Sequence, residues 1–325
     1  MKRILCAAVL AVSCSAAIAS RDARAHAVAG ARVFPVTLTI DDPGVADEAS
    51  IPTFSVQRQG ASGDAGPGWE YNFGAEFDKR ITERFGLGIS TAYTVRTTQG
   101  DKTRTGFQNL NVFAKYQAWV NAPHEAILSL GVVREFGRTG TSHIGADEHG
   151  STTPMIYFGK GMGDLPVPAL RPFAVTGTFG YTIADKKLKA VPPPDTGADA
   201  GVTAIAARQF NTGNANRWVG GLSLQYSLPY LRAQVRDYGL PDFVNRLTPL
   251  VEVAWSSPAS KPSNLGTQLV FAPGVIYSSG SYQIGIEALI PANRESGRNV
   301  GVITQFHLFF DDLFPNSLGK PLISY

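Results

Sequence analysis

Residues 171–182 read RPFAVTGTFGYT, and the alternation within this stretch decides the class of fold. Phe173, Val175, Phe179 and Tyr181 share one parity, whereas alanine, threonine and glycine fill most of the other. Side chains in a β-strand point to opposite faces with a period of two. The stretch therefore predicts a strand with one apolar face and one small, polar face.

One such strand fits a soluble β-sandwich as well as a membrane barrel, so recurrence along the chain has to decide. The alternation recurs with an aromatic-rich apolar parity, in segments of about ten residues, as strands that cross a membrane require. Twelve segments are predicted to be strands, with the facing of 153–162 left open: 51–59, 69–78, 84–96, 107–120, 126–136, 153–162, 171–182, 217–228, 247–256, 267–277, 283–291 and 299–310.

The connections between these segments alternate between short and long. The long ones, 138–152, 184–215 and 258–266, all fall on odd-numbered connections, whereas most even-numbered ones are tight. With the amino terminus in the periplasm, the short turns are periplasmic and the long loops extracellular. The exception is 229–243, a long connection where a short one is expected, which could hold an amphipathic turn of helix at the membrane interface.

A membrane location gives this pattern a physical cause. The bilayer core offers no water to backbone N–H and C=O groups, so only helices and closed sheets can span it. The sequence therefore predicts an all-β fold, a closed antiparallel transmembrane β-barrel of about twelve strands. Aromatic residues near strand ends would form its interfacial girdles: Trp69, Tyr93, Trp119, Tyr181, Trp218, Tyr226 and Trp255. In the alternative, a soluble β-sandwich, the apolar parities would pack between two sheets.

The first nineteen residues have the layout of a secretory signal peptide. A basic start is followed by the apolar run 4–12 and by small residues that end at Ala19. We expect cleavage there and export to the outer membrane. Cys6 and Cys14 both lie in this leader, so the mature chain contains no cysteine; lipidation at Cys14 is the alternative.

The rest of the chain divides into three parts. Residues 20–50 are expected to form a periplasmic N-terminal arm, residues 51–311 the barrel, and residues 312–325 a C-terminal tail. The first strand could instead begin near Val33, because 33–40 also alternates. The formal net charge of +3 falls to +1 without the two basic residues of the leader. A net charge this close to zero does not give the positive potential that binding to nucleic acid needs.

The candidate functional residues are the polar ones at the alternate strand positions that face the lumen. A charge that faced lipid at the bilayer midplane would cost about 2–4 kcal/mol, so charges within these strands are expected to face the lumen. The residues predicted to line it are Glu70, Glu76, Asp78, Arg96, Asn109, Asn111, Lys115, Arg217, Gln225, Glu252, Glu287, Gln305 and His307. We expect closure to gather the acidic ones on one wall, with Arg96, Lys115 and Arg217 elsewhere.

Two interpretations of this inward set remain open. In the first, opposed charges line a narrow aqueous passage that selects small polar or amphipathic solutes. In the second, the same side chains pair with one another and fill the lumen, so no pore exists.

The sequence gives little support to catalysis or metal binding. Residues 143–149 contain two histidines, an aspartate and a glutamate, but their spacing does not match a helical zinc motif, and a solvated loop is expected. There is no G-x-S-x-G element, and we expect no histidine beside a suitable serine in the strands. We therefore predict neither enzyme activity nor a cofactor.

Three short motifs carry a resemblance to a known family. Asp41-Asp42-Pro43-Gly44, Trp69-Glu70-Tyr71 and the ending FHLFFDDLFP over 306–315 resemble outer-membrane proteins named for the phenol meta-cleavage pathway, often labelled transporter-like. The resemblance implies a monomeric barrel that admits small, often aromatic compounds. In this chain fifteen residues follow Phe310, so Phe310 is the candidate for the terminal aromatic that the barrel-assembly machinery reads.

The function predicted from the sequence is a passive outer-membrane channel for small molecules, including aromatic or amphipathic ones. Its expected partners are outer-membrane lipid, the small-molecule solute and the barrel-assembly machinery. The alternatives are a closed barrel with a structural or surface-binding role, and a barrel hydrolase.

Overall fold

A computed structural model of the chain describes residues 27–59, 66–186, 215–259 and 266–323. The expected signal peptide and most of the loop 184–215 lie outside the described residues. Among the described residues, no helix has both the length and the apolar composition that crossing a membrane would need.

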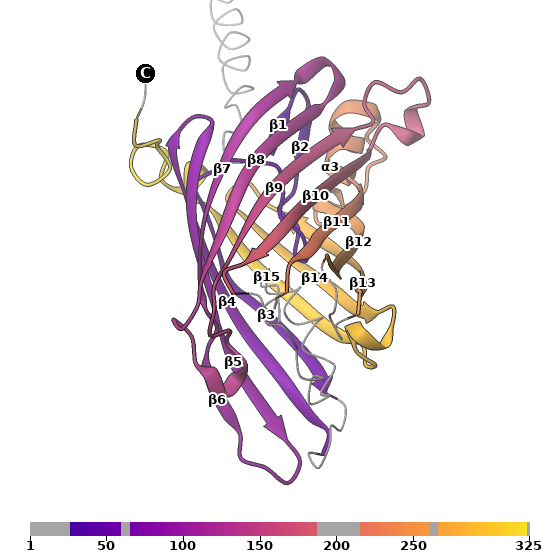
Figure 1. The fold of residues 1–325 in the computed structure, drawn as a ribbon. Coiled ribbons are helices and arrows are strands. Elements are labelled where there is room, and N and C mark those ends of the chain that lie inside the picture. Colours follow the sequence, from indigo (N-terminus) through magenta and orange to yellow (C-terminus); the bar gives the residue numbers. More distant parts are fainter. Residues whose placement is uncertain (1–26, 60–65, 187–214, 260–265, 324–325) are drawn as a thin grey trace, which may run out of the picture.

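The described chain forms a closed antiparallel β-barrel (Figure 1). Each strand pairs with its neighbours in the sequence, and the last strand pairs with the first to close the sheet. Its twelve strands are β3 Glu48–Gln59, β4 Gly68–Thr82, β5 Phe85–Thr98, β7 Leu110–Asn121, β8 Ala126–Phe136, β9 Ser151–Gly161, β10 Phe173–Ala184, β11 Arg217–Tyr226, β12 Leu247–Pro258, β13 Gln268–Ser278, β14 Tyr282–Pro291 and β15 Gly301–Phe309. The predicted fold class is confirmed.

Each predicted strand overlaps an observed strand of the barrel, and the two larger differences are local. The first strand begins at Glu48, three residues before the predicted start. The predicted strand 107–120 is interrupted at residues 108 and 109. The short strand β6 Arg104–Phe107 pairs with the part of β5 that lies beyond the end of β7.

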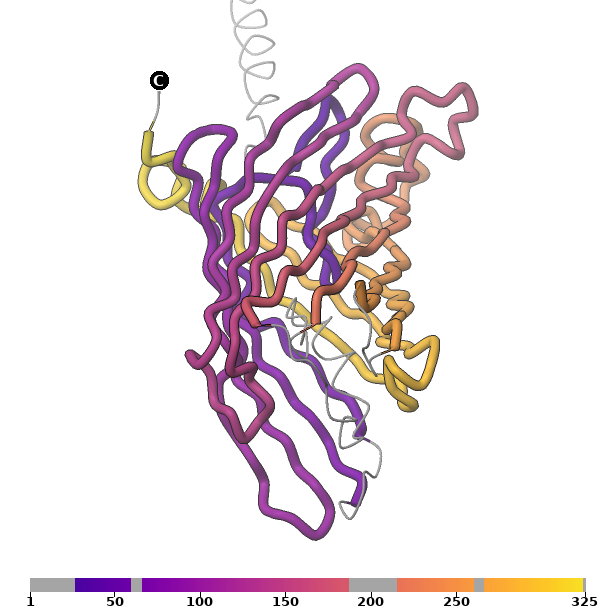
Figure 2. Tube along the Cα trace, in the orientation of Figure 1, coloured from indigo at the N-terminus to yellow at the C-terminus, as the bar shows by residue number. Residues whose placement is uncertain are grey.

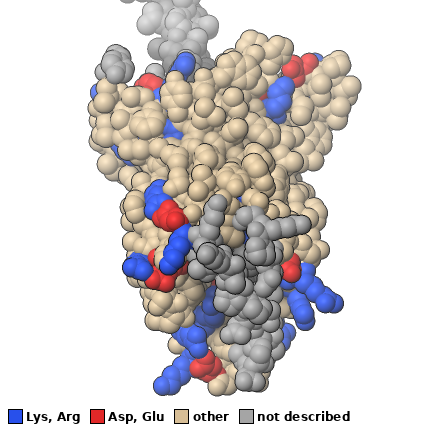
Figure 3. All heavy atoms as spheres, viewed as in Figure 1, with Lys and Arg blue, Asp and Glu red and all other residues tan. Residues whose placement is uncertain are grey.

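The alternation that predicted the fold is seen directly in β10. Phe179 is 44% exposed on the outer surface, whereas its neighbour Thr178 is 5% exposed and faces the interior. On the neighbouring strand β11, Leu222 is likewise exposed and Ser223 is buried. Figure 3 shows the result on one face, where a broad band carries few charges and most charged side chains gather toward the lower, loop end.

The N-terminal segment, residues 27–47, is where the structure departs from the expected periplasmic arm. A small hairpin of β1 Ala27–Ala29 and β2 Arg32–Phe34 leads into an irregular chain that runs inside the barrel before β3 begins (Figure 2). Leu38 and Ile40 of this segment form a buried apolar cluster with inward-facing residues of β12 to β15. The wall residues of the cluster are Leu250, Ala254, Val270, Ala272, Ile276, Leu289 and Ile303.

The physical reason for this placement is that many of the side chains of β12 to β15 that face the lumen are apolar. Those side chains would face water in an empty lumen, and burying them against Leu38 and Ile40 removes apolar surface from water. Two glycines allow the close approach, because a Cβ at Gly221 would collide with Ile40 and one at Gly285 would collide with Leu38.

The two ends of the barrel differ in their connections. One end has the short turns 83–84, 122–125 and 279–281, together with both described chain ends (Figure 1). The long connection 227–246 lies at this same end and contains short helical turns, close to the amphipathic turn expected there. The helical turns of the described chain are η1 Ala122–His124, η2 Ser142–Ile144, η3 Pro168–Leu170, α3 Leu228–Tyr230, η4 Leu231–Val235, η5 Val244–Arg246, η6 Arg294–Ser296 and α4 Phe310–Leu313.

The tail after β15 folds back over the short-turn end. It begins with α4, and the backbone N–H groups of Leu322 and Ile323 donate to the carbonyls of Arg80 and Ile81. The tail therefore docks beside the turn between β4 and β5.

Candidate functional site: the lumen and its N-terminal segment

The structure places the thirteen predicted lumen residues on the interior side of the barrel. Twelve lie on inward positions of strands, and Asn109 lies between β6 and β7. Ten of them are buried, whereas Glu76, Asp78 and Arg96 are half-buried.

The cations of this set do not all lie away from its acidic residues, since Arg96 pairs with Glu70 and Lys115 lies within electrostatic range of Asp78. Arg96 on β5 lies opposite Glu70 on β4, with 2.6 Å between Nη2 and Oε2. The expectation that Arg96 lies away from the acidic residues is therefore wrong, because strand register brings the two side chains together. Arg217 donates to the Ser256 hydroxyl and to the carbonyls of Ser256 and Gly266.

Lys115 on β7 anchors the turn of the N-terminal segment to the barrel wall. Its Nζ lies 3.0 Å from Oδ2 of Asp41 and donates to the carbonyl of Asp42. The same ammonium lies 4.8 Å from the centre of the Tyr157 ring. Nearby, the Ser129 hydroxyl donates to the carbonyl of Pro43 at 2.6 Å. The Asp-Asp-Pro-Gly turn is thus held by side chains of β7 and β8.

Glu252 on β12 holds the segment from the opposite wall. Its Oε2 accepts hydrogen bonds from the backbone N–H of Thr39, at 2.7 Å, and from the Thr39 hydroxyl. Farther along, the side-chain oxygen of Gln283 accepts from the N–H of Val36. Glu287 lies beside Glu252, and both side chains are buried. The segment therefore crosses the lumen and is held by β7 and β8 on one side and by β12 and β14 on the other.

Arg32 fixes the start of the segment at the short-turn end. Its guanidinium lies 3.2 Å from Oε2 of Glu125, donates to the carbonyls of Arg171 and Pro172, and stacks 3.7 Å from the centre of the Tyr230 ring. The Tyr230 hydroxyl also donates to Glu125. Nothing in the spacing of these residues indicated this cluster, because its members come from the N-terminal segment and three separate connections.

The end of the segment is fixed at the same rim. Asp47 accepts from Lys79 at 2.6 Å and from Arg80 at 2.8 Å. Arg80 also lies 2.9 Å from Oδ2 of Asp311 in the tail. The segment, β4 and the C-terminal tail therefore share one network of charges.

His307 belongs to a buried array of polar side chains that the sequence did not indicate. Its Nδ1 lies 2.8 Å from the Ser50 hydroxyl, and its Nε2 lies 3.2 Å from Oε2 of Glu48. A serine therefore lies beside this histidine, but it is not one that suits catalysis. All three side chains are buried, whereas a catalytic serine has to reach a substrate. The array bridges β3 and β15, where the barrel closes.

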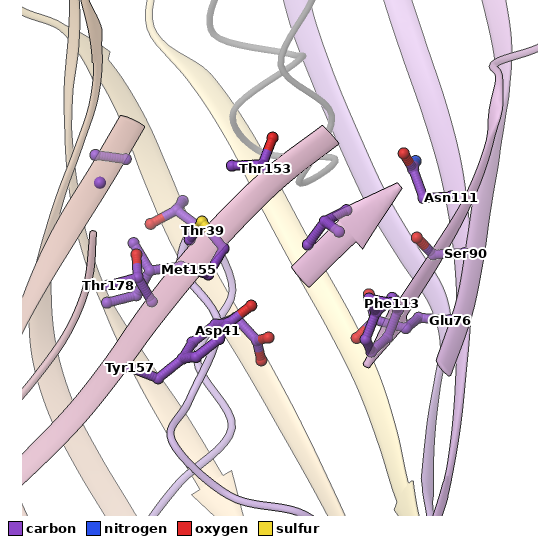
Figure 4. Close-up of a pocket in the computed structure, with 14 residues that line it drawn as sticks. Thr39, Asp41, Glu76, Ser90, Asn111, Phe113, Thr153, Met155, Tyr157 and Thr178 are labelled. Atoms are coloured by element: carbon purple, nitrogen blue, oxygen red, sulfur yellow. The ribbon is translucent and has the colours of Figure 1, made fainter. Parts of the chain in front are cut away.

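A cavity of about 70 Å³ lies on the loop side of the N-terminal segment. Thr39, Ile40 and Asp41 of the segment form part of its lining, and the rest comes from β4 to β12, including Glu76 and Asn111 (Figure 4). Asn111 lies near the loop end of β7. The N-terminal segment therefore separates this cavity from the short-turn end.

The loop 143–149 shows no metal-binding arrangement. His143 contacts the carbonyl of Thr105, and Glu148 forms an ion pair with Arg138. Within the ranges that the structure describes, no group of three or more histidine, cysteine, aspartate or glutamate side chains is arranged to hold a metal ion.

Comparison with known proteins defines the class of fold. No family model matches this chain, and no curated protein matches its sequence. Among solved structures, the COG4313 outer membrane channel from Pseudomonas putida F1 is similar with a TM-score of 0.51 and 12% identity, over 86% of this chain and 100% of that chain. The KdgM porin has a TM-score of 0.43 and 12% identity, over 80% and 99%. Phospholipase A from Escherichia coli has a TM-score of 0.38 and 10% identity, over 84% and 99%. The fold is that of an outer-membrane β-barrel.

Proposed function

We propose that the protein is an outer-membrane channel for small molecules, in which the N-terminal segment closes the lumen toward the periplasm. The observation that carries this proposal is how residues 27–47 are held. Inside the barrel they are attached by side-chain contacts such as Lys115 to Asp41 and Glu252 to Thr39, and by apolar packing. A segment held in this way can move without breaking the strand pairing of the wall.

The solute and the setting are further parts of the proposal. The mixed polar and apolar lining of the lumen suits small aromatic or amphipathic molecules better than large polar ones. We infer that the mature chain acts as a monomer in the outer membrane after signal-peptide cleavage and insertion by the barrel-assembly machinery. Membership of the family named for the phenol meta-cleavage pathway is inferred from the three short motifs alone.

A closed barrel without a pore is the second candidate. It is favoured by the buried segment itself, because apolar packing and paired charges already fill much of the lumen. A barrel hydrolase has less support, because Ser50 and His307 are buried. The first two candidates differ in whether the N-terminal segment moves.

A reversible disulfide between the segment and the wall tests this difference. The Cβ of Ile40 lies 3.4 Å from the position that a Cβ would take at Gly221, close to the separation of about 3.8 Å in disulfides. The double variant I40C/G221C therefore places one bond between the segment and β11 of the wall, in a mature chain expected to have no other cysteine. The purified protein would be reconstituted in planar bilayers and measured in oxidised and reduced forms.

We expect the oxidised double variant to carry much less current than the reduced one, with a reducing agent restoring the wild-type level. The single variants I40C and G221C are the matched controls and should not respond to oxidant. An absence of current from the wild-type protein would support the closed barrel. Equal currents from the two redox forms would show that conduction does not need the segment to move.

A further inference from the structure

The cavity beside the N-terminal segment has an acidic character. Asp41 from the segment and Glu76 from β4 both line it. Behind them lie Asp42, Glu48 and Asp78, within electrostatic range of one another and of Lys115. Five carboxyl groups thus surround one ammonium in this part of the described lumen. The carboxylates of Asp41 and Glu76, which line the cavity itself, repel an anion and attract a cation.

Asn111 supplies an independent observation that the site is incomplete. This residue lines the same cavity and is only 5% exposed, and its side-chain N–H group makes no hydrogen bond to any residue that the structure describes. Figure 4 shows it on the same side of the cavity as Ser90, Phe113 and Glu76. Buried polar groups nearly always have a partner, so an unsatisfied donor indicates a position where an acceptor oxygen can bind.

The size of the cavity limits what can enter. Its volume of about 70 Å³ is roughly half that of a 150 Å³ cavity that accommodates benzene. Only a group of a few heavy atoms can fit. Ile40, Phe113 and Met155 add apolar surface to the lining, against which a short carbon chain can pack.

We propose that this cavity binds the ammonium group of a small organic cation that carries an oxygen acceptor close to its nitrogen. The carboxylates of Asp41 and Glu76 receive the ammonium, and the Asn111 N–H donates to the oxygen. This assignment rests on the proposed channel function, because the cavity lies on the path from the loop end to the N-terminal segment.

Binding at this site would also act on the segment. Lys115 holds the turn through Asp41 and the carbonyl of Asp42. A bound ammonium shares the Asp41 carboxylate with Lys115 and so weakens that ion pair. The cation that occupies the site thereby favours release of the turn from the β7 wall.

Ligand-observed NMR titration of the refolded full mature chain in detergent micelles tests the site without any measurement of transport. Ethanolamine is the probe, ethylamine lacks the oxygen, and glycolate has a similar size with a negative charge. We expect ethanolamine to bind, ethylamine to bind more weakly and glycolate not to bind. Removing one charge-assisted contact in E76Q should weaken ethanolamine binding by about tenfold.

E70Q is the matched control. Glu70 lies on the same strand as Glu76 and faces the same interior, but its carboxylate is paired with Arg96, so its neutralisation should leave ethanolamine binding unchanged. N111A should reduce the preference for ethanolamine over ethylamine. Binding of glycolate as strong as that of ethanolamine would overturn the proposal even if E76Q failed to fold, as would wild-type binding by folded E76Q. Ethanolamine binding without any bilayer current would keep this site and reject the channel function.

Discussion

The two halves of the lumen are built from the same twelve strands but have opposite character. Toward the short turns, the N-terminal segment packs Phe34 and Leu38 into a fully buried interior. Toward the loops, half-buried charges such as Glu76 and Arg96 remain on the wall, and a cavity lies beside the segment. Strand alternation therefore defines the wall of the barrel, whereas what fills the lumen depends on the chain that precedes the first strand.

The two halves also differ in which parts of the chain their polar contacts join. In the loop half, contacts join neighbouring strands, as between Glu70 and Arg96 or Arg217 and Ser256. In the short-turn half, contacts such as Arg32 to Glu125 and Arg80 to Asp47 also join the segment to the wall. Changes to the segment should therefore alter one half of the lumen and leave the other intact.

The largest expected effect comes from deleting residues 27–47. The barrel should still close, because β3 pairs with β15 and β4 without help from the segment. Single-channel conductance in planar bilayers should rise several-fold. Thermal stability should fall, because inward-facing residues such as Val270 and Ile303 become exposed to water. A deletion of residues 20–26 is the control. If the 27–47 deletion conducted at the wild-type level, residues 27–47 would not be what closes the short-turn half of the lumen.

A smaller effect is expected from E252A. The substitution removes the acceptor for the N–H and hydroxyl of Thr39, and a buried donor left without a partner costs about 1–3 kcal/mol. The segment should leave its bound position more often, by about tenfold for 1.4 kcal/mol. The rate at which a thiol reagent labels I40C reports this directly.

E287A is the matched control for E252A. Glu287 is an equally buried glutamate on the same side of the barrel, and among the described residues its carboxyl oxygens make no hydrogen bond to the segment. Labelling of I40C in the E287A background should remain nearer the wild-type rate. If both backgrounds accelerated labelling equally, Glu252 would have no specific part in holding Thr39.

Strand positions could be predicted from the sequence because a period of two is a local property. Phe179 and Thr178 differ in exposure for a reason that lies within one strand. The pair of Glu70 and Arg96 is also predictable from the sequence, because the two residues are equally distant along the chain from Glu83 in the short turn between β4 and β5. Applying hairpin register to the charged residues would have found it.

The position of the N-terminal segment could not be read in the same way. Residues 33–40 alternate weakly, and such a stretch fits an arm, a strand or a lumen filler. The available signal lay elsewhere, in the apolar inward residues Leu250, Val270 and Ile276, which a water-filled lumen would leave exposed. The cluster of Arg32, Glu125 and Tyr230 depends on contacts between distant connections, and no local pattern predicts those.

The smallest expected effect concerns the rim where the segment ends. Burial raises the pKa of Asp311 in α4 to about 8; nearby Arg80 opposes this shift and Asp47 adds to it. In the unfolded chain the same carboxyl has its ordinary pKa of about 3.9. Between these two pKa values the folded rim binds more protons than the unfolded chain does. Its stability should therefore fall as the pH rises from about 4 to about 8.

Protease cleavage of the C-terminal tail at pH 6 and pH 9 measures this local opening. The wild-type tail should be cleaved faster at pH 9, because ionised Asp311 lies beside Asp47 in a buried setting. D311N should show little difference between the two pH values once the protease's own pH dependence is subtracted with an unfolded substrate. Conductance should change less than in E252A, because the contacts of Thr39 and Lys115 with the segment remain. If D311N kept the wild-type pH response, a group other than Asp311 would be titrating. The charge network of Asp47, Arg80 and Asp311 would then have no role in keeping the short-turn half closed.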